Sequence, residues 1–237
     1  MAAWVHTQYW NKALFNAYRL YAAREAPKYK GYPNYDCADL SIIFLIQFAA
    51  SNGLSLTFWD NCQVRYISKA TKQFPTTCPS EYKLITYKWS SVADYICAIQ
   101  RRIGANALFK QNTVHNEIAP EPGDLLLKSD HAALIFAVYK NGDKHPLAGK
   151  NIPIFPGDEE ARKQKNVTEY FYTDPISPKE GIFIDYLNHR NNDKPKKELI
   201  YYASIEKLGD LGYDFRKFNS GVIDNWNDWN GEGDPPR

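Results

Sequence analysis

The chain has 237 residues, of which 29 are Lys or Arg and 27 are Asp or Glu, so its formal net charge is +2. With 44% hydrophobic and 24% charged residues, the composition is that of a globular protein with one core, and we treat residues 1–237 as a single domain. The scattered Lys and Arg argue against a nucleic-acid partner. The longest apolar run, 40–50, falls short of the roughly 18 residues that a membrane-spanning helix needs, so no membrane span is expected.

The first 26 residues lack the basic, apolar and small-residue segments of a secretory signal peptide, so we expect synthesis in the cytoplasm without one. Four cysteines are too few for a disulfide scaffold, and they form no Cys-x-x-Cys pair. Cys62 and Cys78 flank a predicted hairpin. We expect all four cysteines to be free thiols. The alternative, in an oxidising compartment, is a bond between Cys62 and Cys78, which geometry decides.

Two helices are predicted in the first quarter of the chain. Residues 9–26 carry apolar side chains at helical spacing, and Pro27 ends that helix. Residues 38–51 are apolar almost all round and are followed by Asn52-Gly53, which predicts a helix buried on nearly every side. Its start at Cys37 is expected at the bottom of a crevice or against the core.

Two short strands, 54–59 and 63–68, are predicted before the middle of the chain, followed by a third helix at 91–103 that starts with a capping-box-like Ser91 and Asp94. In the second half, strands are expected from Gly123, His131, Thr168, Gly181 and Glu198. Helices followed by strands indicate an α+β fold with an antiparallel sheet. We interpret residues 141–167 as an insertion or flap and 224–237 as a polar tail.

One cysteine and one histidine stand where chemistry is possible. A helix start favours the thiolate through its unpaired N–H groups, and Cys37 has that position. His131, the first residue of a predicted strand, is the best placed of five histidines to act as its base. Each residue alone is more often structural, because free cysteines are usually buried small hydrophobes.

The sequence around both residues resembles the NlpC-type family of papain-like cysteine peptidases and amidases. In that family an Asp-Cys-Ser-Gly-Leu stretch opens the central helix, and a Pro-Gly-Asp-Leu strand precedes the strand that begins with histidine. The matching residues are Asp36, Cys37 and Leu40 in the first motif and Pro122, Gly123, Asp124, Leu125 and His131 in the second. The resemblance covers about 100 of the 237 residues and implies a papain-like fold.

The sequence departs from the family pattern at two places. Ala38 and Asp39 replace the Ser-Gly pair after the cysteine, and Ala132-Ala133 replaces the residues after the histidine. We interpret Asp39 as a complement to the helix dipole that faces away from Cys37. The order of cysteine before histidine argues against the circularly permuted relatives, which act as lipid acyltransferases or deubiquitinase-like enzymes.

A third polar residue completes the site in the family, on a strand after the histidine strand. The candidates here are Asn188, Asp185 and His189. Alternation puts Asp185 and His189 on one face and Asn188 on the other, so the pattern alone does not choose between them, and we take Asn188 as the first candidate. Tyr35 and Tyr32 are oxyanion-hole donors or groove-wall packing residues.

The chemistry implied by the resemblance is amide hydrolysis through a thioester. The Cys37 thiolate attacks the carbonyl, His131 protonates the leaving amine, and water then hydrolyses the thioester with His131 as base. No cofactor or metal is implied, because no cluster with ligand spacing accompanies Asp130 beside His131.

Family members mostly cut amide bonds in the peptide stems and crossbridges of peptidoglycan. A domain of this type without a signal peptide resembles the amidase effectors of type VI secretion. The resemblance therefore implies an antibacterial toxin that acts in a rival's periplasm, with an immunity protein and a secretion-apparatus carrier protein as partners. Two alternatives stay open: a cysteine hydrolase of another protein or small amide, and a non-catalytic binding module on a papain-like fold.

Overall fold

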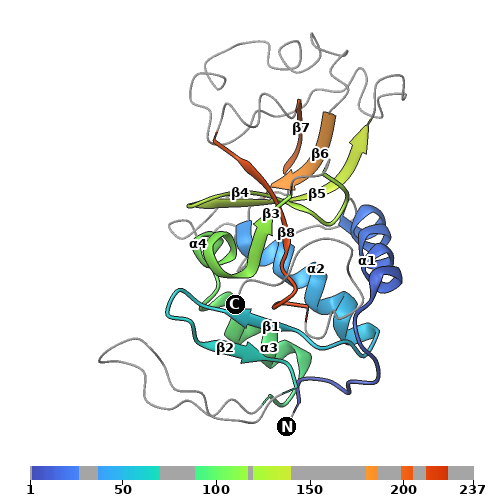
Figure 1. Ribbon diagram of the computed structural model, residues 1–237, viewed down its shortest axis with the longest axis vertical. Coiled ribbons are helices and arrows are strands. Elements are labelled where there is room, and N and C mark those ends of the chain that lie inside the picture. The colour runs from blue at the N-terminus through green and yellow to red at the C-terminus, as the bar shows by residue number, and fades with distance from the viewer. Residues whose placement is uncertain are drawn as a thin grey trace.

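The computed structural model describes residues 2–26, 37–69, 89–116, 120–139, 180–185, 199–204 and 212–223. These residues form an α+β structure in which helices pack on a six-stranded antiparallel sheet (Figure 1). The elements are α1 (Lys12–Glu25), α2 (Cys37–Ser51), β1 (Thr57–Trp59), β2 (Arg65–Ile67), α3 (Val92–Gln100), α4 (Ala105–Ala107), the π-helix η2 (Leu108–Asn112), β3 (Thr113–His115), β4 (Leu125–Lys128), β5 (His131–Tyr139), β6 (Glu180–Asp185), β7 (Leu199–Ser204) and β8 (Asp214–Phe218). The predicted α+β class with an antiparallel sheet is confirmed.

Helix α1 begins three residues later than the apolar pattern predicts. The side chain of Asn11 accepts a hydrogen bond from the backbone N–H of Leu14 at 2.9 Å, which caps the helix and fixes its start. Trp10 therefore lies outside the helix, but it is buried, and its indole N–H donates to the carbonyl of Ser55 at 2.8 Å. The apolar pattern thus included Trp10, which packs in the core from the extended segment before the helix.

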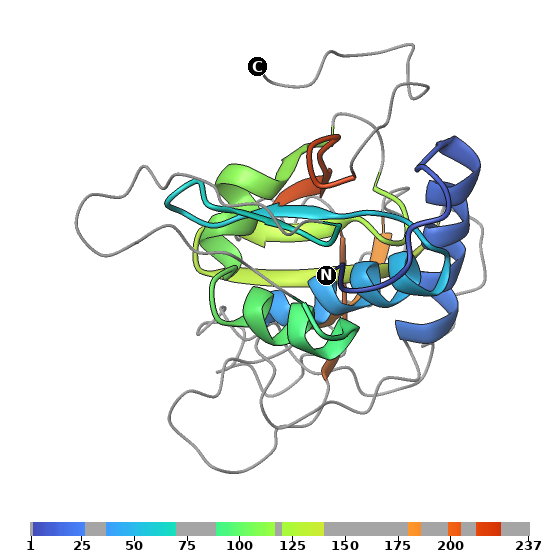
Figure 2. The ribbon, with the colours of Figure 1, turned by 90° about the horizontal axis from the view of Figure 1, so that it is seen from below.

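Helix α2 lies in the middle of the core, as the sequence predicts. Twelve of its 15 residues are buried, while Gln47 is exposed. Gly53 has a φ of 62°, the left-handed conformation that the predicted Asn-Gly ending supplies. Helix α2 packs against β5 on one side and against α3 on another, so it separates the sheet from α3 (Figures 1 and 2).

The hairpin of β1 and β2 is shorter than the two predicted strands and is held by one buried carboxylate. Asp60, in its turn, accepts hydrogen bonds from the backbone N–H groups of Cys62 and Val64 at 2.8 and 2.9 Å, and from the Tyr66 hydroxyl at 3.1 Å. The Tyr95 hydroxyl of α3 donates to the carbonyl of Tyr66 at 2.7 Å. This hairpin is therefore fixed to α3 and the core.

The six-stranded sheet has the order β3-β8-β4-β5-β6-β7, and each pair of neighbouring strands is antiparallel. Strands β4, β5, β6 and β7 correspond to predicted strands. Strands β3 and β8 were not predicted, because they are short and carry charged residues such as Asp214 and Arg216. Strand β8 pairs with both β3 and β4, so the sheet is joined by a late segment of the chain.

Several predictions fall outside the described residues. They are the flap at 141–167, the strand from Thr168 and the tail at 224–237. Within the part of the chain that the structure describes, no helix is long and apolar enough to cross a membrane.

Candidate active site

Cys37 is the first residue of α2 and belongs to the apolar core. Its thiol is free, and the residue is 4% exposed. Because α2 is enclosed on almost every side, the core fixes the place of its first turn. The predicted position of Cys37 against the core is confirmed.

Asp39, in the same first turn, is buried rather than facing solvent. The Gln100 side chain of α3 donates to its Oδ2 at 3.3 Å, so Asp39 links the start of α2 to the end of α3. This contact adds a packing role to the predicted interaction with the helix dipole. The sequence could not indicate it, because Asp39 and Gln100 lie 61 residues apart.

His131 begins β5 and lies beside Lys128 of β4 and Tyr213, the residue before β8. It is the register partner of Lys128 across the turn of Ser129 and Asp130. Its ring meets the ring of Tyr213 edge to face, with 6.2 Å between centroids. The Lys128 ammonium lies 5.1 Å from the centroid of the Tyr213 ring and 3.7 Å from the Asp130 carboxylate. The structure thus places His131 in a small cluster with a tyrosine and a lysine.

The turn between β4 and β5 lies on the side of the molecule where α2 begins (Figures 1 and 2). Ala132 and Leu134 pack in the same core as Cys37. Because residues alternate between the two faces of a strand, His131 and Ala133 lie on the opposite face of the sheet. The structure therefore packs α2, which carries Cys37, against β5, which carries His131, while the His131 ring contacts Tyr213. A pair formed by Cys37 and His131 stays a prediction.

Of the three candidates for the third residue, Asp185 lies within the described part of the chain. It is the last residue of β6 and the register partner of Ala133, two residues along β5 from His131. Asn188 and His189 lie outside the described residues, as do Tyr32, Tyr35 and Asp36. The choice of the third residue and of the oxyanion donors stays a prediction.

The Pro-Gly-Asp motif forms the turn before β4. Gly123 has a φ of +89°, and a Cβ atom there would lie 2.9 Å from Cε1 of Tyr18. The Tyr18 hydroxyl donates to the Gly123 carbonyl at 3.5 Å. Glycine is therefore needed both for the backbone conformation and for the close approach of α1.

Asp124 of the same motif is fully buried. The Asn116 side chain and the Glu121 backbone N–H donate to its Oδ2 at 2.7 and 2.9 Å, and Arg19 lies 3.6 Å from its Oδ1. Burial raises the pKa of Asp124 to about 6, because desolvation outweighs the attraction of Arg19. In this chain the motif residues Gly123 and Asp124 hold the turn to α1.

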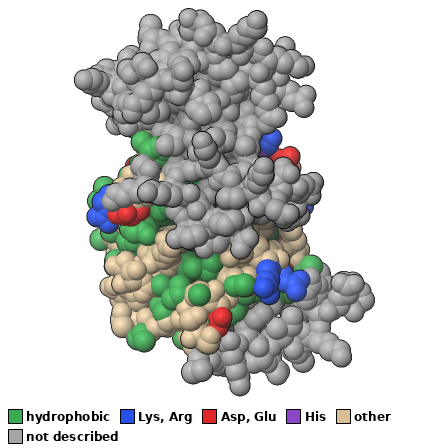
Figure 3. All heavy atoms as spheres, turned by 180° about the vertical axis from the view of Figure 1, so that it is seen from behind, with side chains coloured by type: hydrophobic (Ala, Val, Ile, Leu, Met, Phe, Trp, Pro, Cys, Tyr) green, Lys and Arg blue, Asp and Glu red, His purple; other side chains and the backbone are tan. Residues whose placement is uncertain are grey.

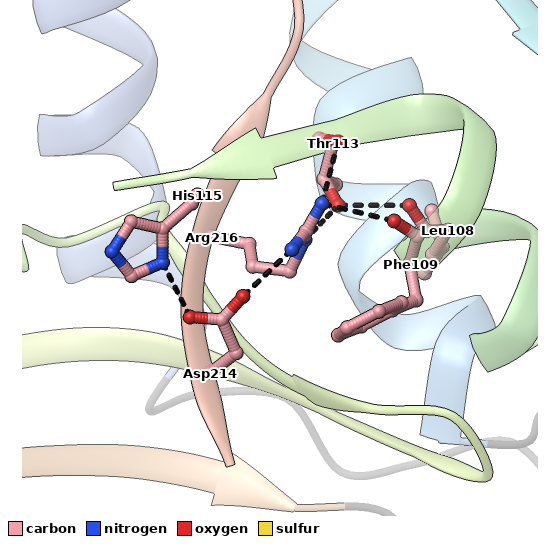
Figure 4. A network of polar contacts seen from close by, with 6 residues as sticks. All are labelled: Leu108, Phe109, Thr113, His115, Asp214 and Arg216. Atoms are coloured by element: carbon pink, nitrogen blue, oxygen red, sulfur yellow. Dashed lines mark hydrogen bonds and ion pairs between the residues drawn. The ribbon is translucent and has the colours of Figure 1, made fainter. Parts of the chain in front are cut away.

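A second histidine forms a network that the sequence did not indicate (Figure 4). Nδ1 of His115 lies 2.5 Å from Oδ1 of Asp214, and Arg216 donates to Oδ2 of Asp214 at 2.6 Å. Arg216 also donates to the Thr113 hydroxyl at 2.8 Å and to the Phe109 carbonyl at 3.0 Å. The imidazole is oriented but exposed. The network joins β3 to β8, and the sequence did not predict either strand, so it could not predict these contacts.

The cysteines divide into two groups. Cys37 and Cys97 are free, Cys97 being exposed on α3. Cys62, in the turn between β1 and β2, is disulfide-bonded. The expectation that all four cysteines are free is therefore wrong for Cys62. Cys78, the alternative partner in an oxidising compartment, lies outside the described residues.

On the face opposite to that of Figure 1, the described residues form no large patch of a single charge sign. There, Lys, Arg, Asp and Glu side chains lie in small groups among hydrophobic and uncharged ones (Figure 3). Among the described residues, no group of three or more His, Cys, Asp and Glu side chains could hold a metal ion.

Function has to be inferred from these residues and their contacts. No protein-family model, no curated protein and no solved structure matches the chain.

Proposed function

We propose that the protein is a cysteine hydrolase of amide bonds with a papain-like catalytic domain. The observation that carries this proposal is the position of Cys37 as the first residue of a buried helix that packs against the strand beginning with His131. This is the order and placement of elements that the resemblance to NlpC-type enzymes implies. A free thiol at the start of a helix is a suitable nucleophile.

In the proposed mechanism the Cys37 sulfur attacks the carbonyl carbon of the substrate, and the backbone N–H of Cys37 stabilises the oxyanion. His131 takes the thiol proton of Cys37 and transfers it to the leaving amine, and the C–N bond breaks to leave a thioester. Water, activated by His131, then releases the acid and restores the thiol. Because His131 contacts Tyr213 and lies on the sheet face opposite to the Cys37 core, the proposal requires the start of β5 to rearrange so that the imidazole reaches Cys37 in the substrate complex.

The proposed substrate is the peptide part of peptidoglycan, and the proposed role is that of an antibacterial effector delivered by type VI secretion to a rival's periplasm. The resemblance supplies this substrate class. The disulfide at Cys62 supports action in an oxidising compartment, since disulfides persist there and are rare in the cytoplasm. A toxin of this kind needs an immunity protein in the producing cell and a carrier in the secretion apparatus.

The proposal is tested by incubating the purified protein with isolated peptidoglycan and analysing soluble fragments by mass spectrometry. Wild type is expected to release stem-peptide fragments, and Cys37→Ala and His131→Ala are expected to release none. His115→Ala is the matched control, because its imidazole belongs to the separate network on β3 and should leave cleavage unchanged. Folded wild type that releases no fragments would contradict the peptidoglycan substrate.

The same variants separate the parts of the proposal. Cleavage that is lost in Cys37→Ala but kept in His131→Ala would show a cysteine enzyme whose base is another residue. The rate at which iodoacetamide alkylates Cys37 near neutral pH distinguishes an enzyme from a binding module, whose thiol would react slowly. The rate is measured in Cys97→Ser, which removes the other free thiol. Toxicity that appears only when a signal peptide is fused to the chain would support the wall as target, and equal toxicity without it would point to a cytosolic amide.

A further inference from the structure

The hydroxyl of Ser41 is a buried polar group without a hydrogen-bond partner. Ser41 lies in the first half of α2, and its exposed fraction is 0%. Within the described part of the chain its Oγ forms no hydrogen bond. Burying an unpaired hydroxyl costs folding free energy, so such groups are rare in protein cores. Ser41 therefore has a side chain that the stability of the fold does not explain.

Helix geometry directs this hydroxyl towards Cys37. Ser41 follows Cys37 by four residues, and residues at this spacing lie on one face of a helix, one turn apart. The Cα–Cβ bonds of a helix tilt towards its N-terminus, so the Ser41 side chain is directed at the turn that carries Cys37. The Cys37 thiol is free, and the residue is 4% exposed. The unpaired hydroxyl and the candidate nucleophile thus share one enclosed face of α2.

The Cys37 sulfur becomes a better hydrogen-bond acceptor when it ionises. A neutral thiol is a weak acceptor, whereas hydrogen bonds to a charged group are roughly twice as strong as those between neutral groups. A serine hydroxyl rotates to suit a new acceptor. Ser41 is therefore placed to gain a partner when the thiolate forms, and the cost of its unpaired hydroxyl falls on the neutral thiol state.

We propose that Ser41 is a positioning residue whose hydroxyl donates a hydrogen bond to the Cys37 thiolate and favours the ionised, reactive form. The inference rests on the proposed function in taking Cys37 as the nucleophile, but thiolate formation is measured without any substrate. Ser41 keeps its own proton throughout. In the proposed cleavage the thiol proton moves to His131 and from there to the leaving amine, so the step balances without a further reactant.

The ionisable groups around α2 are the same in every variant that the test compares. Asp39, in the first turn, is bound by Gln100 of α3 at 3.3 Å. His131 of β5 lies on the opposite face of the sheet. The other titratable groups in or against the core on elements that pack on α2 are Tyr18, Arg19 and Tyr21 of α1 and Tyr95 of α3. A difference between variants therefore reports the Ser41 hydroxyl.

The test is the pH profile of Cys37 alkylation in the full chain, with iodoacetamide as the probe and the Cys37 peptide quantified by mass spectrometry. In Ser41→Ala the midpoint of the profile should rise by about one pH unit, because one hydrogen bond to a charged group is lost. Ser41→Thr keeps the hydroxyl and should have the wild-type midpoint. Ile42→Val, which removes a methyl group from the next buried residue of α2, is the control and should also leave the midpoint unchanged.

Thermal unfolding separates this role from a structural one. Because the hydroxyl has no partner in the folded thiol form, Ser41→Ala should keep or raise Tm, whereas loss of a structural hydrogen bond would lower it. An unchanged midpoint in Ser41→Ala, an equal rise in Ile42→Val, or a Tm that falls by several degrees in Ser41→Ala would each overturn the proposal. A raised midpoint in a protein that releases no peptidoglycan fragments would support the Ser41 contact and contradict only the proposed substrate.

Discussion

Gly123 and Asp124 lie next to each other in the turn before β4, and both lie against residues of α1. Gly123 lies against the ring of Tyr18, and Asp124 is buried 3.6 Å from Arg19. The sequence identified both residues through a family motif, and it could not show that α1 is what they pack against. A motif of adjacent residues is visible in a sequence, while contacts with residues about 100 positions away form only in the folded chain.

Gly123→Ala is expected to lower the free energy of unfolding by about 2–3 kcal/mol. An L-residue is strained at a φ of +89°, and its Cβ would lie 2.9 Å from Cε1 of Tyr18. Urea denaturation followed by circular dichroism measures the effect. Gly104→Ala is the control, because a Cβ there meets nothing within 4 Å; equal losses in both variants would contradict the packing argument.

Asp124 should make stability fall as pH rises from about 4 to about 6. Its folded pKa of about 6 lies above the ordinary pKa of 3.8 for an aspartate, so the folded chain binds the extra proton in this window. The contribution is complete below pH 3.8 and lost as pH passes 6, about 2–3 kcal/mol in total. The difference in unfolding free energy between wild type and Asp124→Asn, measured by urea titration across this range, should follow that curve. Parallel curves would contradict the assignment.

At the scale of elements, the sequence was most informative for α2 and least for β3 and β8. The β-branched residues of the apolar run 38–51 also suit a strand, but its length and its Asn-Gly ending favoured a helix, and the helix begins one residue earlier. Short strands with charged residues, such as Asp214–Phe218, have no comparable signal. The resemblance located His131 at the start of its strand but could not fix its face, since a shift of one residue exchanges the two faces of a strand.

Helix α3 depends on a cap that the sequence predicted. The Ser91 side chain accepts a hydrogen bond from the Asp94 N–H at 3.2 Å, while the Asp94 carboxylate accepts one from the Ser90 N–H at 3.0 Å. Ser91→Ala should therefore lower the free energy of unfolding by about 1 kcal/mol, and Ser91→Gly by only a few tenths. Thermal unfolding of both variants tests this order, and a larger loss for glycine would argue against capping.

At the scale of the whole molecule, the extended N-terminal segment binds the helices to the hairpin region. The Trp4 and Trp10 indoles donate to the carbonyls of Leu54 and Ser55 at 2.7 and 2.8 Å, and the Ala3 N–H donates to the Ser68 carbonyl at 2.9 Å. The prediction that the first helix starts at residue 9 was wrong, because the pattern alone does not distinguish a tryptophan in a helix from one in an extended segment.

Trp10→Ala should cost about 3–5 kcal/mol of unfolding free energy. Its ring is 2% exposed and packs against Phe15 and Phe48, so truncation leaves a cavity and removes the hydrogen bond to the Ser55 carbonyl. Val5→Ala in the same segment should change stability by less than about 0.5 kcal/mol, because Val5 is 78% exposed. Equilibrium denaturation in urea compares the two, and similar values would show that the segment is not anchored through Trp10.

The place of β8 between β3 and β4 has a consequence for synthesis of the chain. Strand β4 ends at residue 128 and β3 at 115, but the strand that joins them starts at residue 214. A nascent chain that has passed β4 by some 80 residues therefore still has an open gap in its sheet. Most of the strands of this sheet therefore emerge from the ribosome before the sheet can close, so its two parts are expected to join only after β8 has been synthesised.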